Sequence, residues 1–229
     1  MYIFCGGMPR AGSTVQYQLA AELVERFNKG YRMGWFPPGN LDDYLRRHSP
    51  MSEWWVIKTH VCTPGVRQRA KAGKAKSLFI YRDLRDVVVS FMFKHHWGFD
   101  QTMADPTFKQ MVEHSSEWEE LLGCLSFRYE DYYDNWAEMV EQISEHIGLK
   151  VSHIRAQTIS ATVSLSAQHI RTTTIPSKQP YDEKHLLHRG HISQTNGKPG
   201  AWKKLLAPAQ ADKVVQQYHD WMEAHGYLT

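Results

Sequence analysis

The chain has 229 residues, of which 42% are hydrophobic and 22% charged, and this length and balance predict one soluble globular domain over residues 1–229. The formal net charge of +3, without any arginine- or lysine-rich arm, does not indicate a nucleic-acid-binding protein. No apolar stretch is long enough to span a membrane, and the first predicted strand begins at residue 2, which leaves no room for a signal peptide. Three scattered cysteines without a C-x-x-C pair favour reduced thiols and a cytoplasmic location.

The predicted elements alternate between strands and helices. Short apolar runs predict strands at 2–6, 54–59, 77–82 and 124–129. Helical spacing predicts helices at 13–28 (with Ser13 as its N-cap), 84–94, 107–122, 134–147 and 208–224. Gly- and Pro-rich composition predicts loops over 31–40 and most of 172–200. This order predicts an α/β fold with a central parallel sheet flanked by helices, in which ligands bind beyond the carboxyl ends of the strands.

The stretch GGMPRAGST, residues 6–14, lies between the first predicted strand and the first helix. It has the layout of the phosphate-binding loop in P-loop nucleoside triphosphatases, but Ser13 stands where their Lys is expected. Gly12 permits a sharp turn, Ser13 and Thr14 supply hydroxyl donors, and Arg10 supplies a positive charge. By itself the stretch is equally compatible with a tight turn that binds no ligand.

Two further stretches place polar residues at predicted strand ends. In VIKTH, strand alternation directs Lys58 and His60 to the same side, and an imidazole beside an anion site is suited to general base catalysis. In IYRDLRDVVVSF, Arg82 ends a strand and Ser90 lies two helical turns later, an arrangement that can hold a phosphate. The alternatives are a surface histidine and ion pairs at a helix start, which contribute little stability.

Together, these stretches resemble the sulfotransferases that use 3′-phosphoadenosine 5′-phosphosulfate (PAPS). The resemblance rests on PRAGST (9–14), KTH (58–60), YRDLRDVVVS (81–90), FRYEDYYDNW (127–136) and NGKPGAWKKLL (196–206), which occur in the family's order. It implies catalytic roles for His60 as general base and for Lys58 and Arg10 as cations at the transferring group. It also implies that PAPS is bound by Arg10, Ala11, Gly12, Ser13, Thr14, Arg82, Ser90, Tyr129, Gly197, Lys198, Pro199 and Gly200. The product would be adenosine 3′,5′-bisphosphate (PAP), and no metal would be required.

The chain departs from the family pattern at two positions that concern the donor. Val15 stands where the family has a Trp that stacks on adenine, and Thr195-Asn196 stands where a basic pair often precedes the C-terminal glycine. The second change removes an expected ligand of the 3′-phosphate. Lys198, Arg189 and His191 are the candidates to replace it.

The acceptor is less determined than the donor. Trp35, Phe36, Phe93, His95 and Trp97 are the candidate acceptor-site residues, and sparse basic clusters favour a small molecule, such as a bacterial natural product, over a polysaccharide. Transfer to a hydroxyl or to an amine, and a monomer or a homodimer, all remain open. Two rival functions also remain: a P-loop kinase of a small metabolite, and a nucleotide-binding module without catalysis.

Overall fold

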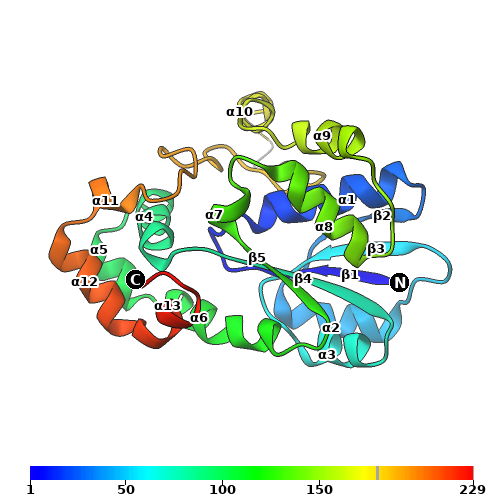
Figure 1. Cartoon of the computed structure of the whole chain (residues 1–229), viewed down its shortest axis with the longest axis horizontal. Coiled ribbons are helices and arrows are strands. Elements are labelled where there is room, and N and C mark those ends of the chain that lie inside the picture. Colours follow the sequence, from blue (N-terminus) through cyan, green and yellow to red (C-terminus); the bar gives the residue numbers. More distant parts are fainter. Residues whose placement is uncertain (179–180, 229) are drawn as a thin grey trace.

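The computed structural model describes residues 1–178 and 181–228. Within these residues, five strands form one sheet in the order β2-β3-β1-β4-β5, and all neighbouring strands are parallel (Figure 1). The strands are β1 (Tyr2–Cys5), β2 (Gly30–Trp35), β3 (Trp54–Lys58), β4 (Ala75–Tyr81) and β5 (Cys124–Arg128). The predicted α/β fold with a central parallel sheet is therefore confirmed.

Two apolar cores, one on each face of the sheet, hold the strands in place. Successive side chains of a strand point to opposite faces, so Phe4 and Phe79 contribute to one core, whereas Ile3, Val56 and Leu78 contribute to the other. All five side chains are buried. Burial on both faces explains why the central strands are continuous apolar runs in the sequence.

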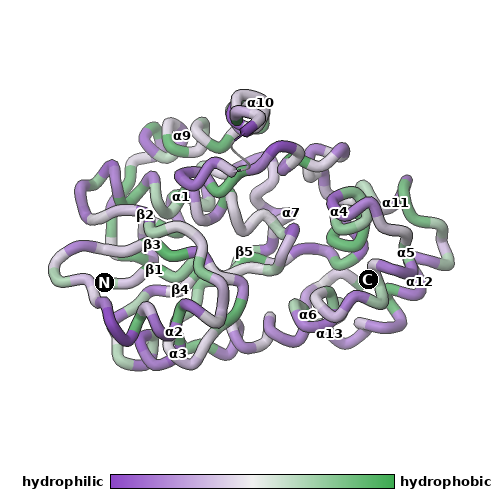
Figure 2. The backbone as a smooth tube through the Cα atoms, turned by 180° about the vertical axis from the view of Figure 1, so that it is seen from behind, coloured by the Kyte–Doolittle hydropathy of each residue, from purple (hydrophilic) through white to green (hydrophobic). Residues whose placement is uncertain are grey.

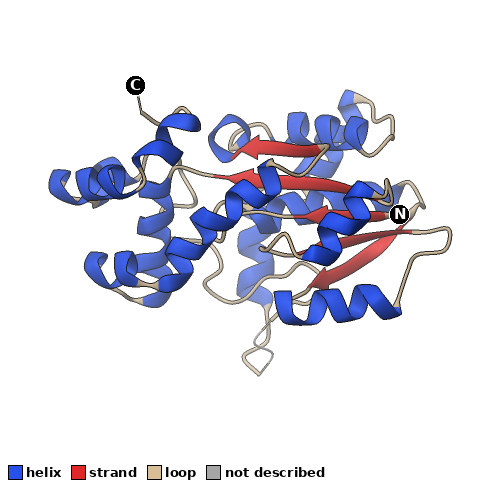
Figure 3. Cartoon of the chain, turned by 90° about the horizontal axis from the view of Figure 1, so that it is seen from below, coloured by secondary structure: helices blue, strands red, loops and turns tan. Residues whose placement is uncertain are grey.

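Helices cover both faces of the sheet and also gather beyond the carboxyl ends of its strands (Figure 3). One face is covered by α1 (Ser13–Arg26), α8 (Trp136–His146) and α9 (His153–Ala161), with α10 (Leu165–Thr174) outermost. The other face is covered by α2 (Pro38–Arg47) and α3 (Pro64–Lys71). The group beyond the strand ends contains α4 (Leu84–His95), α5 (Phe99–Ala104), α6 (Pro106–Glu119), α11 (Trp202–Leu205), α12 (Pro208–Gln217) and α13 (His219–Ala224). A short helix, α7 (Tyr129–Tyr132), follows β5 directly.

One edge of the sheet differs from the sequence prediction. A loop is predicted over 31–40, but Gly30–Trp35 forms the edge strand β2, paired with β3. The pairing shifts register between Arg32 and Gly34, where Gly34 has φ of 91°, a conformation that glycine adopts without steric cost. Arg32 fastens the strand to α1 through an ion pair of 2.6 Å with Glu25. Gly34 therefore belongs to an irregular strand, and Gly39, the other glycine of the predicted loop, belongs to α2.

Two other predictions need correction. The predicted helix over 208–224 is two helices, α12 and α13, separated at Tyr218. The first helix begins at Ser13, but its N-cap is Gly12, with φ of 88° and no side-chain cap. The strand β5 is a sheet edge in which Phe127 alone is buried, because no further strand covers its outer side. The remaining predicted helices agree closely with α4, α6 and α8.

The segment between α10 and α11 forms no helix where it is described, in agreement with the loop predicted there. Its one bridge joins Asp182 and Leu187. The tube is largely hydrophilic along this segment (Figure 2). In Figure 1 it runs from α10 toward α11, past the carboxyl ends of the strands. Residues close to His191 are thereby brought to the loops that follow the central strands.

The three cysteines are free thiols, of which Cys5 and Cys62 are buried and Cys124 is half-buried. Burial raises the pKa of the Cys62 thiol to about 11 and that of Cys124 to about 12, so both are protonated at neutral pH. Among residues 1–178 and 181–228, every helix is too short or too polar to span a membrane.

Candidate active site

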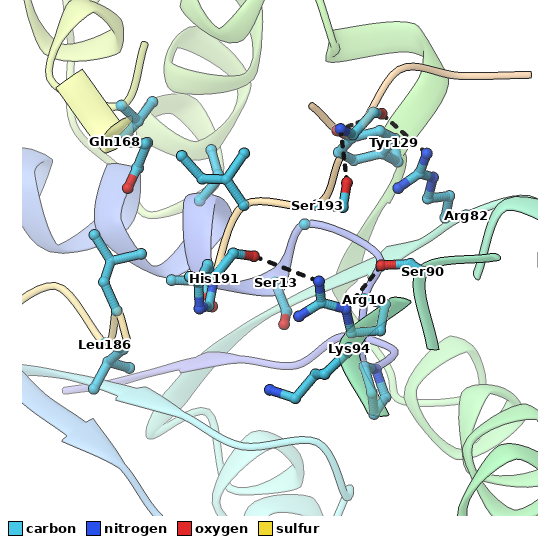
Figure 4. A pocket seen from close by; sticks show the side chains of 18 of the residues that line it. Arg10, Ser13, Arg82, Ser90, Lys94, Tyr129, Gln168, Leu186, His191 and Ser193 are labelled. Carbon is cyan, nitrogen blue, oxygen red and sulfur yellow. Dashed lines mark hydrogen bonds between the residues drawn. The ribbon is translucent and has the colours of Figure 1, made fainter. Parts of the chain in front are cut away.

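A cavity of about 740 Å³ lies at the carboxyl ends of the strands. Its walls come from the turn after β1, from the ends of β3 and β4, from α4 and from the segment before α11 (Figure 4). The predicted site residues that line it are Arg10, Gly12, Ser13, Thr14, Trp35, Lys58, His60, Arg82, Ser90, His95, Tyr129 and Gly197. Residues from six separate stretches of the sequence therefore meet at one cavity.

The turn between β1 and α1 requires glycine at two positions. Gly12 has φ of 88°, and a Cβ at this position would lie 2.7 Å from the ring of Tyr129. A Cβ at Gly7 would lie 2.7 Å from the side chain of Ile80 and 2.8 Å from that of Ser13. This close packing sets the first turn of α1 against the cavity, where unpaired N–H groups and the helix dipole favour an anion.

Arg10 directs a fixed positive charge into the cavity. Its backbone has φ of 68°, an uncommon conformation for a residue with a Cβ. Its Nε donates to Ser90 Oγ at 2.9 Å, and its Nη2 donates to the carbonyl oxygen of His191 at 3.4 Å (Figure 4). Burial and the nearby Arg82 lower the pKa of Arg10 to about 10, so the guanidinium still carries its charge at neutral pH.

Lys58, the last residue of β3, is a buried cation without a carboxylate partner among the described residues. Its side chain is 7% exposed, and its Nζ donates to Thr14 Oγ1 at 2.9 Å. Burial, assisted by the charge of Arg10, lowers the pKa of Lys58 to about 7. A buried ammonium is costly unless an anion compensates it. The site is therefore built to receive a negative group next to Lys58.

His60 presents a basic nitrogen to the same cavity. Its Nδ1 lies 2.7 Å from the carbonyl oxygen of Gly7, so Nδ1 carries the hydrogen and Nε2 keeps its lone pair. Burial and the charge of Lys58 lower the pKa of His60 to about 3, so the ring is neutral at physiological pH.

Trp118 Nε1 donates to the His60 carbonyl at 3.2 Å. The same indole lies against Gly6, where a Cβ would come within 2.5 Å of the ring.

Arg82, buried directly after β4, binds the loop that precedes α11 (residues 196–201, the closing loop). Its Nη2 donates to the carbonyl oxygens of Gly197 at 2.9 Å and Lys198 at 3.3 Å. Its guanidinium carbon lies 4.4 Å from the centre of the Tyr129 ring, and Tyr129 Oη donates to the Gly197 carbonyl at 3.0 Å. Arg82 Nε is buried without a partner among the described residues. Because Arg82 lines the cavity, this N–H is available to a hydrogen-bond acceptor on a ligand.

Asp86 holds the other half of the closing loop. Its carboxylate accepts the backbone N–H of Gly200 at 2.7 Å and that of Trp202 at 2.9 Å. Burial raises the pKa of this carboxyl group, although the neighbouring Arg82 opposes the rise. The indole of Trp202 lies under the guanidinium of Arg85 at 4.0 Å. The loop is therefore fixed by the helix that carries Ser90.

The remaining predicted donor-binding residues lie around the cavity and do not line it. Ala11 is fully buried within the turn after β1, and Pro199 and Gly200 belong to the closing loop. Of the three candidates to replace the missing basic ligand, Lys198 is exposed and Arg189 donates to the Ile175 carbonyl at 2.9 and 2.7 Å. Only the third, His191, lines the cavity, and its Nδ1 is buried without a partner among the described residues.

The predicted acceptor residues divide into two groups. Trp35 and His95 line the cavity. Phe36 instead packs against Tyr44, with ring centroids 4.7 Å apart, and Phe93 packs against the core. Trp97 stacks on His95 at 4.4 Å but does not itself line the cavity.

Several lining residues were not identified from the sequence, among them Phe91, Lys94, Tyr133, Trp136, Leu186, Leu187, His188 and Ser193. Lys94 lies four residues after Ser90 on α4, and side chains four apart share a helix face, so this residue could have been found. Residues 186–193 carry no motif that would have revealed them.

The charge of the cavity wall is strongly positive. Among the described lining residues, Asp134 is the single carboxylate, against the cations Arg10, Lys58, Arg82 and Lys94. Residues 1–178 and 181–228 contain no group of three or more His, Cys, Asp or Glu side chains that could hold a metal ion. The chemistry of the wall favours a ligand with several negative charges.

Comparison with known proteins identifies the family. The family model described as "Sulfotransferase domain" matches residues 3–226. Sulfotransferase 6B1 of Mus musculus is 23% identical over an alignment of 251 residues, which covers 95% of this chain and 75% of the relative. The structure of retinol dehydratase with androsterone and inactive cofactor PAP is similar, with a TM-score of 0.63 and 16% identity over 96% of this chain and 80% of that chain. A mouse sulfotransferase complexed with PAP has a TM-score of 0.61 and 16% identity over 97% and 84% of the two chains. The resemblance noted in the sequence is thus confirmed, and the chain belongs to the sulfotransferase family.

Proposed function

We propose that this sulfotransferase transfers the sulfuryl group of PAPS to a hydroxyl or an amine of a small-molecule acceptor. The observation that carries the proposal is the excess of cations around the turn after β1, where Lys58 is buried without a carboxylate partner among the described residues. PAPS has a phosphosulfate at one end and a phosphate at the other, so its charges match a wall that is positive along its length. The structures of two related proteins contain PAP, which is PAPS without the sulfuryl group.

The residues present fit both ends of the donor. The first turn of α1, with Ser13, Thr14 and Lys58, supplies donors for the phosphosulfate. The unpartnered Nε of Arg82 and the hydroxyl hydrogen of Ser90, whose oxygen already accepts from Arg10, supply donors for the 3′-phosphate. For the adenine, we propose stacking on an aromatic group that includes Tyr129 and Trp136, whose rings lie 5.8 Å apart.

In the proposed reaction, His60 Nε2 accepts the proton of the acceptor group while that group bonds to sulfur. The bond between sulfur and the oxygen of the 5′-phosphate breaks at the same time, and PAP is the product. Arg10 and Lys58 stabilise the negative charge that develops on the bridging oxygen. A neutral His60 suits the role of general base, since a protonated imidazole could not accept the proton. Because a sulfuryl group carries less charge than a phosphoryl group, we propose that these cations suffice without a metal.

The acceptor class is proposed from the size of the cavity and from the ligands of related structures. Two related structures contain retinol or androsterone, and the cavity of about 740 Å³ has the size of a small-molecule site. We therefore keep the hypothesis of a small-molecule acceptor, such as a natural product sulfated late in its synthesis. The cytoplasmic location expected from the cysteines stays a prediction.

The function is tested by measuring thermal stabilisation with PAP, with ATP–Mg²⁺ and with 5′-AMP. We expect PAP to stabilise the protein most, because it alone has a 3′-phosphate for Arg82, and we expect transfer from labelled PAPS to proceed in EDTA. A preference for ATP–Mg²⁺ would instead indicate a kinase. Tight PAP binding without transfer to any acceptor of a broad metabolite panel would indicate a binding module.

A further inference from the structure

Lys94 is a cation of the cavity that the donor does not require. It lies one turn beyond Ser90 on α4, lines the cavity and is exposed within it (Figure 4). No carboxylate of the described residues pairs with it; its Nζ instead lies 3.0 Å from His188 Nε2. The anionic groups of PAPS already account for Arg10, Lys58 and Arg82. The charge of Lys94 is therefore left for another ligand.

The contact with His188 orients Lys94 without neutralising it. His188 Nδ1 lies 2.7 Å from the carbonyl oxygen of Arg189, so the ring hydrogen is on Nδ1 and the lone pair of Nε2 accepts from the ammonium of Lys94. A neutral imidazole leaves the full positive charge in place. An ammonium has three N–H donors, so two remain for a ligand.

The charged and apolar groups in the same cavity as Lys94 indicate what the rest of that ligand contains. The charge of Lys94 contributes to the low pKa of both Lys58 and His60, so the ammonium acts on the same part of the cavity as the proposed base. The wall of the same cavity also contains the apolar side chains of Phe91 and Leu187. Partial desolvation inside the cavity and the charge of Arg10 lower the pKa of Lys94 itself, and an anion bound beside it would offset the repulsion from Arg10.

We infer that the acceptor is an acid: a molecule with an apolar body, a hydroxyl or amine that reaches His60, and an anionic group that pairs with Lys94. The inference rests on the proposed function, since it concerns the acceptor of that reaction. A carboxylate is the simplest such group, and a phosphate or sulfate ester would present the same chemistry.

The test compares acids with their amides, which have nearly the same shape and no charge. The PAP-bound enzyme is titrated with 4-hydroxybenzoate, 4-hydroxyphenylacetate and 3-(4-hydroxyphenyl)propionate, and with the amide of each. We expect the acid of at least one pair to bind about tenfold more tightly than its amide, as a charge-assisted hydrogen bond implies. Lys94→Met should abolish that preference and leave PAP affinity unchanged. Lys109→Met, which alters an exposed lysine of α6 paired with Glu113, should keep it.

Three results would overturn the inference: no acid preferred by the wild type, a preference that survives Lys94→Met, or equal weakening of acid and amide in that variant. A loss of PAP affinity in Lys94→Met would assign the lysine to the donor and also overturn it. These outcomes differ from failure of the proposed function, in which the wild type would not bind PAP in preference to ATP–Mg²⁺.

Discussion

Replacing Lys58 with Met should stabilise the folded protein while it abolishes sulfuryl transfer. In the folded chain the pKa of Lys58 falls from 10.5 to about 7, which corresponds to roughly 4–5 kcal/mol of unfavourable free energy for the charged form. Met fills a similar volume without charge. The lost hydrogen bond to Thr14 Oγ1 removes about 1 kcal/mol, which leaves about 3–4 kcal/mol in favour of the variant.

The advantage of the variant should depend on pH in a defined direction. In the unfolded chain Lys58 keeps its proton up to pH 10.5, whereas in the folded protein it releases the proton above a pH of about 7. Between these values the unfolded state binds more protons, so the stability of the wild type rises with pH. The free energy of unfolding of Lys58→Met should therefore exceed that of the wild type most at or below pH 7, and this difference should shrink toward pH 10.

The measurement is urea unfolding of both proteins at pH 6 and pH 9, together with transfer from labelled PAPS. Lys109→Met serves as the control, because it removes an exposed lysine with little energetic role. If Lys58→Met were less stable than the wild type at pH 6, the reasoning that Lys58 is held at an energetic cost would be refuted. Unchanged transfer activity would refute its place in the reaction.

Three further substitutions test the donor site, the base and the turn. Arg82→Ala should weaken PAP binding by about 1.5–3 kcal/mol and leave 5′-AMP binding unchanged. If calorimetry found equal PAP affinity for the variant and the wild type, Arg82 would not be a ligand of the 3′-phosphate. His60→Ala should lower transfer by about 10²- to 10⁴-fold with PAP affinity retained, and a small rate effect would argue against a base at this position. Gly12→Ala should lower the free energy of unfolding in urea by about 1–3 kcal/mol, and by more than Gly148→Ala does. Both glycines have positive φ, but only at Gly12 would a Cβ meet a ring, that of Tyr129. Equal losses of stability would contradict a role for the Tyr129 contact.

The central part of the fold was predictable because local patterns and tertiary structure agree there. The strands β1, β3 and β4 are apolar runs buried on both faces, and the polar residues at their ends necessarily meet at one edge of a parallel sheet. The strand β2 was missed because its glycines indicate a loop, while the contacts that stabilise it come from β3 and from the ion pair between Arg32 and Glu25. These contacts leave no mark on local periodicity.

The cavity wall was predictable only where a motif exists. The motif residues meet at one cavity, but the aromatic residues proposed for the acceptor divide between the cavity wall and the core. Phe36 follows an edge strand whose pairing the sequence does not reveal. The contact between Lys94 and His188 joins residues 94 positions apart, and that between Arg82 and Gly197 joins residues 115 positions apart. Such pairings depend on the path of the segment before α11 past the carboxyl ends of the strands, and no local sequence pattern determines that path.

The way Arg82 holds the closing loop has a consequence for the timing of the reaction. Only Nη2 contacts the loop, and a guanidinium has five N–H donors, so a phosphate can bind on Nε without displacing the loop. Nucleotide and loop then raise each other's affinity for the site, as linkage requires. We therefore expect the spent nucleotide to have a long residence time, because its departure would require the loop to open. We expect this opening to limit turnover when the acceptor is abundant.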